Sequence, residues 1–134
     1  TECNLSDKVI REIIQIAKSK TNNCYAPYSK IRVVAILLSK GEKIFGVNVE
    51  NSSYGLTICA ERVALFNAIT YGERDFVELA IVTDHEKPIP PCGACRQVLA
   101  EFSRDLRILM YSIKSKKLIE ATLSELLPQP FKLE

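Results

Sequence analysis

Three cysteines lie where two predicted helices begin, and this placement constrains the chain more than any other feature of its sequence. Cys59 stands at the start of one helix, and Cys92 and Cys95 form a Cys-x-x-Cys pair at the start of another. The positive end of a helix dipole lowers the pKa of a thiol and favours the thiolate. Thiolates are natural ligands of Zn²⁺, and three protein ligands leave one tetrahedral position open, as in catalytic zinc sites.

Charged residues beside these cysteines indicate how such a site could work. Glu61 follows Cys59 by two residues, which is too close for it to ligate the same ion easily. Its carboxylate can instead approach a zinc-bound water, whose pKa zinc lowers toward ~7, and move protons there. Zn²⁺ with three thiolates leaves a net negative charge. Arg62 and Arg96 each directly follow a site residue, and we expect both to donate to the thiolates and offset that charge.

Other candidate ligands lack suitable spacing. His85 is the sole histidine, and Cys3 and Cys24 lie in the N-terminal segment and the loop after it. We expect these two cysteines to be ordinary thiols. An odd total of 5 cysteines fits a disulfide framework poorly. Taken alone, the Cys-x-x-Cys pair is also compatible with a redox pair or with half of a structural zinc site.

Composition narrows the class of protein. A chain of 134 residues fits one domain, which we expect to span residues 1–134. Its 18 basic and 16 acidic residues give a net charge of +2, without the concentrated basic surface of proteins that bind nucleic acid through phosphates. No apolar run approaches the ~18 residues of a membrane span, and the start of the chain lacks a signal-peptide pattern. We therefore expect a cytoplasmic protein that binds neither nucleic acid nor membrane.

Hydrophobic spacing predicts alternating helices and strands. Helices are predicted over residues 5–20, 59–71, 93–103 and 124–127, and Ser6 is the predicted N-cap of the first. Strands are predicted over residues 31–38, 43–49, 76–83, 107–112 and 117–121. This order implies one sheet covered by helices.

Five short motifs occur in order along most of the chain. They are Tyr-Ala-Pro-Tyr-Ser at 25–29, Asn-Val-Glu-Asn at 48–51, Cys-Ala-Glu-Arg at 59–62, Pro-Cys-Gly-Ala-Cys-Arg-Gln at 91–97 and Leu-Leu-Pro-Gln-Pro-Phe at 126–131. Cys-x-Glu followed by Pro-Cys-x-x-Cys is the three-cysteine form of the zinc nucleobase deaminase signature. With these motifs the chain resembles the cytidine deaminase family, specifically its small homotetrameric type. We expect an α/β fold, a three-layer α/β/α sandwich on a mixed five-stranded sheet.

The resemblance implies a reaction and its machinery. The reaction is zinc-dependent hydrolysis of cytidine and 2′-deoxycytidine to the uridine nucleosides with release of ammonia, as in pyrimidine salvage. By position, Cys59, Cys92 and Cys95 would bind one Zn²⁺ per chain, and zinc-bound hydroxide would attack C4 of the ring. Glu61 would take a proton from the water, protonate N3 and later serve the leaving amine.

The resemblance also implies residues that bind the nucleoside. Asn48 and Glu50 would hold the ribose 3′-hydroxyl, and the backbone of Ala60 would read the pyrimidine edge. Residues two apart on a strand face the same side, and an amide with a carboxylate suits a hydroxyl that both donates and accepts. Without the other motifs, Asn48 and Glu50 would also fit a pair of solvated residues at a strand end.

Contacts between subunits are implied as well. Phe131 would cross a subunit boundary and pack on the base in the next site of a homotetramer. Ser52 and Tyr54 would be contributed by a neighbouring subunit near the 5′-hydroxyl. The alternative for Phe131 is an anchor that fixes the tail on the core of its own chain.

The first predicted strand departs from the family pattern Phe-x-Val-Gly-Ala-Ala. Ile31 stands where the family has Phe, so it keeps apolar contact with a base but loses ring stacking of about 1–3 kcal/mol. Val34 and Ile36 stand where the family has Gly and Ala, so they fill space that these smaller residues leave open, and the sequence leaves their effect on the base pocket open. Ser52 replaces a frequent Ala.

Other functions stay open at this stage. A deaminase of a modified cytosine nucleoside, such as blasticidin S, would share the zinc chemistry, although Asn48 and Glu50 favour an ordinary ribose. The near-neutral charge argues against a polynucleotide-editing deaminase. A non-catalytic, zinc-stabilised interaction module would not need Glu61 and would usually supply a fourth Cys or His.

Overall fold

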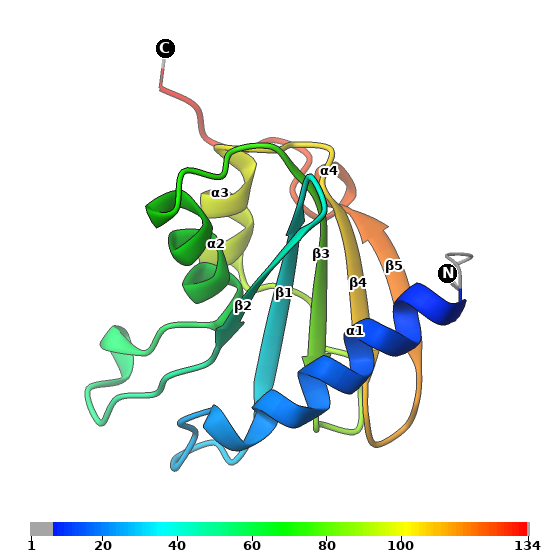
Figure 1. Ribbon diagram of the computed structural model, residues 1–134. Helices are drawn as coiled ribbons and strands as arrows, with labels where there is room; N and C mark the ends of the chain where they lie inside the picture. The colour runs from blue at the N-terminus through cyan, green and yellow to red at the C-terminus, as the bar shows by residue number, and fades with distance from the viewer. Residues whose placement is uncertain (1–6, 134) are drawn as a thin grey trace.

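The computed structural model of the protein describes residues 7–133, which form one five-stranded sheet with helices on both faces (Figure 1). The predicted N-cap Ser6 and the predicted ordinary thiol Cys3 lie outside the described residues. Within residues 7–133, no helix is long and apolar enough to cross a membrane.

The sheet is mixed, as predicted. Its strands are β1 (Val33–Ser39), β2 (Glu42–Val47), β3 (Phe76–Thr83), β4 (Arg107–Ser112) and β5 (Leu118–Thr122). They lie in the order β2-β1-β3-β4-β5. β3 and β4 run parallel, whereas the other three neighbouring pairs run antiparallel. Each predicted strand therefore forms, with bounds that differ from the expected ones by no more than two residues.

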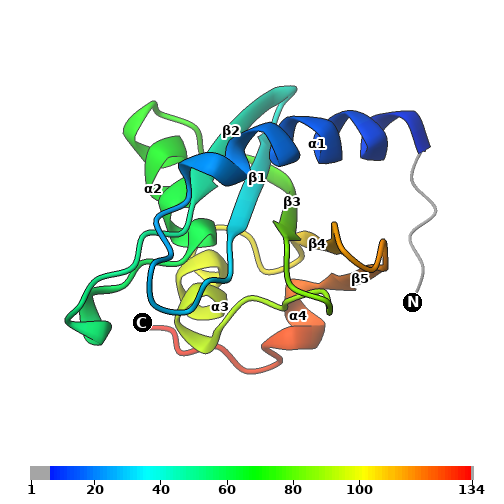
Figure 2. The same cartoon turned by 90° about the horizontal axis from the view of Figure 1, so that it is seen from below.

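Helices cover the sheet on two sides. α1 (Asp7–Lys20) crosses one face, and α2 (Ala60–Thr70) and α3 (Gly93–Ala100) lie on the other, as Figure 2 shows from below. α4 (Leu123–Leu126) follows β5 and begins with a capping box between Thr122 and Glu125. This arrangement confirms the three-layer α/β/α sandwich.

Alternating residues of β1 enter two different hydrophobic cores. Ala35 and Leu37 are buried on the α2 side, whereas Val34 and Ile36 are buried on the α1 side, against Ile13. The structure answers the question that the sequence left open, because Val34 and Ile36 face away from α2 and Cys59 and do not line the pocket beside them. The period of two in a strand sends neighbouring side chains to opposite sides of a sheet.

Gly46 in β2 lies directly against the backbone of α2. A Cβ atom at position 46 would lie 2.3 Å from the backbone nitrogen of Ala64 and 2.4 Å from the carbonyl oxygen of Ala60. Both atoms belong to the helix backbone and cannot move aside as a flexible side chain would. Glycine therefore permits the first turns of α2 to lie directly against β2.

Replacing Gly46 with alanine is expected to lower the free energy of unfolding by at least about 3 kcal/mol, because the added methyl group forces α2 away from the sheet. Denaturant unfolding monitored by circular dichroism measures this loss. The matched control is Gly55→Ala, where an added Cβ meets nothing within 4 Å. Equal stability of the two variants would contradict this account of the packing.

Candidate metal and substrate site

The three predicted zinc ligands converge at the N-termini of two helices. Cys59 is the N-cap residue of α2 and Cys92 is the N-cap residue of α3. The sulfur of Cys92 lies 3.7 Å from that of Cys59 and 3.5 Å from that of Cys95, and all three sulfurs lie within 4.8 Å of one another. Residues more than 30 positions apart in the chain are thus brought to one point.

This cluster fits a zinc ion. Thiolates that ligate Zn²⁺ tetrahedrally at ~2.3 Å lie about 3.8 Å apart, close to the spacing of the sulfurs found here. The backbone N–H of Cys95 donates to Cys92 Sγ at 3.4 Å, which fixes these two donors relative to each other at the start of α3. We compared the positions of the His, Cys, Asp and Glu side chains of the described residues. These three cysteines form the one group of three or more that lies close enough together to hold a metal ion.

Neighbouring groups stabilise negative charge on the sulfurs. A hydrogen bond with Cys95 and the guanidinium of Arg62 lower the pKa of Cys59 to about 5 against the opposing effect of burial. Arg62 Nη2 donates to Cys59 Sγ at 3.7 Å. The same hydrogen bond and burial raise the pKa of Cys95. The expected contact of Arg62 with a thiolate is present.

Arg96 has a different role from the predicted one. Its Nε donates to the carbonyl oxygen of Pro91 at 2.8 Å and its Nη1 donates to that of Leu126 at 3.0 Å. The expectation that Arg96 donates to the thiolates is therefore wrong, because two backbone carbonyls hold its guanidinium. Arg96 instead braces the loop before Cys92 against the end of α4.

Glu61 is a buried carboxylate in the first turn of α2. Its side chain is only 4% exposed and lines a pocket together with Cys59 and Cys92. Burial, with the charge of Cys59 as a smaller cause, raises the pKa of Glu61 to about 7. A carboxyl group with this pKa exchanges protons readily near neutral pH, which suits a general acid–base role.

The pocket has a volume of about 250 Å³ and combines apolar walls with polar groups. Its apolar lining includes Ile31, Ile58, Ile89 and Pro90, and Ala60 lies beside the cysteines. The charged side chains that line it are those of Glu50 and Glu61, and no Lys, Arg or His among the described residues contributes to it. Such a pocket suits a small neutral molecule with several hydrogen-bonding groups.

Asn48 lines this pocket, and its side chain is held by the backbone at and just before the first residue of β1. Its Nδ2 donates to the carbonyl oxygen of Ile31 at 2.8 Å, and its Oδ1 accepts from the N–H of Val33 at 3.1 Å. The residue lies just past the end of β2, beside Val49, which forms single bridges to two other segments. The structure thus corrects the predicted strand 43–49, which ends at Val47.

Glu50 lines the same pocket and organises the turn at residues 26–29. Its Oε1 accepts from the N–H groups of Tyr28 at 2.9 Å and Ser29 at 3.1 Å, and its Oε2 accepts from Ser29 Oγ. The hydroxyl of Ser29 lowers the pKa of Glu50. Asn48 and Glu50 thus face one pocket although they lie outside β2, contrary to the expected shared strand.

Three predicted substrate contacts lie outside the pocket of their own chain. Ser52 is exposed, and Tyr54 is 75% exposed with its ring edge-on to that of Tyr28 at 6.0 Å between centroids. Phe131 is 72% exposed, so its ring is not buried in the core of its own chain. The anchor alternative for Phe131 therefore disagrees with the structure.

The sequence interpretation missed several residues of the pocket. Ser29 lies in the first recognised motif, and Ile89 and Pro90 directly precede the Pro-Cys-x-x-Cys motif. Their position next to these motifs is a signal that could have identified them. Thr57 also lines the pocket, and its Oγ1 accepts from the N–H of Asn51 at 3.1 Å.

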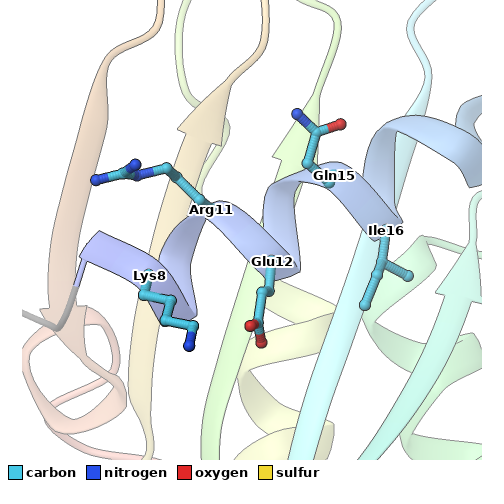
Figure 3. Close-up of a pocket in the computed structure, with 5 residues that line it drawn as sticks. All are labelled: Lys8, Arg11, Glu12, Gln15 and Ile16. Atoms are coloured by element: carbon cyan, nitrogen blue, oxygen red, sulfur yellow. The ribbon is translucent and has the colours of Figure 1, made fainter.

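A second hollow has no comparable chemistry. It has a volume of about 480 Å³ and lies along the outside of α1, as Figure 3 shows. Its lining residues are Lys8, Arg11, Glu12, Gln15 and Ile16. They all come from one helix and mix charges of both signs. The pocket beside the cysteines is therefore the candidate active site.

Known proteins resemble this chain over most of its length. The family profile described as the cytidine and deoxycytidylate deaminase zinc-binding region matches residues 7–111. A cytidine deaminase of Halalkalibacterium halodurans is 48% identical over 128 residues, which cover 94% of this chain and 93% of that protein. A blasticidin-S deaminase of Bacillus cereus is 28% identical over 125 residues, 87% of this chain and 88% of that protein.

Solved structures agree with these sequence matches. The crystal structure of a cytidine deaminase from Burkholderia pseudomallei superposes with a TM-score of 0.84 at 40% identity, and the match covers 90% of this chain and 98% of that one. The matched residues include the three clustered cysteines that fit zinc. The chain therefore belongs to the cytidine and deoxycytidylate deaminase family of zinc-dependent hydrolases.

Proposed function

We propose that this protein hydrolyses the 4-amino group of cytidine and 2′-deoxycytidine, giving the uridine nucleosides and ammonia, and that residues 1–134 act as one deaminase domain. The observation that carries this proposal is the buried carboxylate of Glu61 beside three sulfurs that lie within 4.8 Å of one another. Cytidine deaminases at 48% and 40% identity are similar to the chain over most of its length.

The cysteines and Glu61 divide the chemistry between them. Cys59, Cys92 and Cys95 would hold Zn²⁺, which supplies the Lewis acidity that makes water nucleophilic near neutral pH. Glu61 accepts a proton from the attacking water and passes it to N3 of the base as the oxygen adds to C4. Glu61 then delivers the second proton to the amino group, which leaves as ammonia. A pKa of about 7 lets this one carboxyl group act in both directions.

The remaining polar groups orient the nucleoside. The backbone N–H of Ala60 lies in the first turn of α2, where N–H groups lack partners within the helix, and it is placed to meet the pyrimidine edge. Asn48 and Glu50 hold the ribose 3′-hydroxyl. Ile31 contacts the base through its apolar side chain, and it lines the pocket whereas Val34 and Ile36, the other departures from the family pattern at this place, do not.

The charges of the pocket favour a nucleoside over a nucleotide. Glu50 and Glu61 line it without a cationic side chain among the described residues, and a 5′-phosphate needs such a partner. Glu61 also disfavours the non-catalytic zinc module, because a purely structural site gains nothing from a buried carboxylate. A deaminase of a modified cytosine nucleoside is the more distant alternative, given 28% identity to a blasticidin-S deaminase.

The complete enzyme is a homotetramer in this proposal. Ser52, Tyr54 and Phe131 lie on the surface of the chain, where they are available to a neighbouring subunit. In that assembly Phe131 packs on the base in the next site, and Ser52 and Tyr54 approach its 5′-hydroxyl. Because the zinc ligands must stay reduced, we place the reaction in the cytoplasm.

Loss of one thiol is expected to remove the metal. Replacing Cys92 with serine should weaken zinc binding by more than about 100-fold, since even the loss of a residue that only orients a ligand costs 10–100-fold. Metal analysis of the purified protein measures the zinc content per chain. Cys24→Ser is the matched control and should keep about one zinc per chain, because Cys24 lies outside the sulfur cluster. Full zinc content in Cys92→Ser would contradict the ligand assignment.

Replacing Glu61 with glutamine is expected to lower kcat on cytidine by about 10³-fold, because the amide cannot transfer the protons. The zinc content should stay at the wild-type value. The ultraviolet shift from cytidine to uridine gives the rate, and Glu101→Gln, on the exposed end of α3, is the matched control. Activity of Glu61→Gln within tenfold of the wild type would overturn the proposed role.

Replacing Glu50 with glutamine is expected to raise KM for cytidine about tenfold or more, since a hydrogen bond to a charged group is lost. The same variant should barely change KM for 3′-deoxycytidine, which lacks the hydroxyl. Because Ser29 lowers the pKa of Glu50, the contribution of this carboxylate is complete above its usual pKa of ~4.3 and disappears only as pH falls through the lowered value. The ratio of KM between Glu50→Gln and the wild type should therefore stay constant between about pH 7 and 5, because the titration of Glu61 affects both proteins alike. An equal rise in KM for both nucleosides would argue against contact with the 3′-hydroxyl.

A further inference from the structure

The C-terminal segment after α4 is attached to α3 by one side-chain amide. Gln97 Nε2 donates to the carbonyl oxygen of Phe131 at 2.9 Å, and Gln97 Oε1 accepts from the N–H of Phe131 at 3.1 Å. Both backbone polar groups of Phe131 are thus satisfied by one amide. Two parallel hydrogen bonds fix both the position and the orientation of the Phe131 backbone, because either bond alone would allow the segment to rotate.

Two arginines hold the end of α4 and the start of the segment that follows it. Arg96 Nη1 donates to the carbonyl oxygen of Leu126 at 3.0 Å, and Arg104 Nη2 donates to that of Pro128 at 3.4 Å. The path of the segment is therefore set before it reaches Gln97. The contacts of Gln97 set the orientation of the one aromatic residue that follows.

Phe131 is largely exposed although its backbone is held by hydrogen bonds. The residue is 72% exposed, and the C-terminal segment leaves the body of the molecule near α3 (Figure 1). Phe131 is not among the residues that line the pocket of its own chain. A rigidly held, exposed aromatic side chain is typical of a residue that contacts another molecule.

The pocket offers a matching surface on a second copy of the chain. Ile31, Ile58 and Ile89 form an apolar wall and are each partly exposed. A base that lies on this wall keeps one face open, and an aromatic ring is well suited to cover it. This step rests on the proposed function, in which Phe131 packs on the base in the site of a neighbouring subunit.

We propose that Gln97 is a positioning residue for that contact. Gln97 lies on α3 two residues after Cys95. One helix therefore carries a metal ligand of its own site and the amide that holds Phe131 for the next site. Gln97 itself touches neither zinc nor nucleoside. Its two hydrogen bonds to Phe131 hold the backbone so that the ring projects toward the neighbouring subunit in a single orientation.

A double-mutant cycle tests this inference on the zinc-loaded full chain. Gln97→Ala should raise KM for cytidine about tenfold with kcat changed less, and zinc content should be unchanged. Phe131→Ala should raise KM at least as much. The double variant should match Phe131→Ala alone, because Gln97 acts only through that ring. Gln97→Glu, which keeps the acceptor and loses the donor, should have an intermediate KM.

Gln129→Ala is the matched control, because Gln129 is an exposed amide in the same segment. It should leave KM unchanged. Additive effects of Gln97→Ala and Phe131→Ala would overturn the inference, as would an unchanged KM in Gln97→Ala. Dissociation of the Gln97→Ala homotetramer at the assay concentration, measured by sedimentation, would also overturn it. The weaker binding of cytidine would then result from loss of subunit assembly.

Hydrogen exchange separates failure of this inference from failure of the proposed function. The amide of Phe131 should be protected in the wild type and in Gln129→Ala, and exposed to exchange in Gln97→Ala. A wild-type protein that is protected at Phe131 but inactive on cytidine would reject the proposed substrate. It would also reject the role of the Gln97–Phe131 hydrogen bonds in binding that substrate. A wild-type protein that is active on cytidine but shows no protection of the Phe131 amide from exchange would reject the positioning role of Gln97 alone.

Discussion

The convergence of two helix N-termini is the constraint on which the rest of this structure depends. β3 and β4 are adjacent and parallel, so the helix between them starts beside the end of β3 and returns across one face of the sheet. α2 lies on that same face, and its first turn reaches the start of α3 because Gly46 allows it to contact β2 closely. Three sulfurs from two segments thereby come within ligand distance, and the helix dipoles add at the point where thiolate charge must be stabilised.

Negative charge in the site is partly balanced by one arginine. Arg62 points to Cys59, whereas Arg96 is committed to backbone carbonyls and stabilises the loop that carries Cys92. The negative cluster in turn makes ionisation of the buried Glu61 less favourable, in addition to the effect of burial. A carboxyl group that would be fully ionised at neutral pH on the surface is thus brought to a pKa at which it can both accept and release a proton.

Local pattern predicts the elements of this fold and the composition of its metal site, but not relations that depend on tertiary packing. Strand bounds and the cysteine cluster follow from hydrophobic spacing and helix starts. The side of the sheet to which Val34 and Ile36 point cannot be predicted in this way. A strand that is buried on both faces shows no alternation of polar and apolar residues. The partners of Arg96 and the position of Asn48 beyond β2 depend on segments distant in sequence, α4 and the chain before β1.

Taken alone, one chain leaves its site accessible to water. Cys92 is exposed and the pocket wall at Ile31 and Ile89 is partly exposed, although proton transfer by a buried carboxyl group works best where water is excluded. The same chain holds an aromatic ring outward at Phe131 through the amide of Gln97. In the assembly that we propose, the open pocket of one copy and the exposed ring of another would form complementary halves of one site. In the proposed homotetramer, each chain would therefore supply its own metal ligands and proton-transfer carboxyl group, and its neighbour would cover the base.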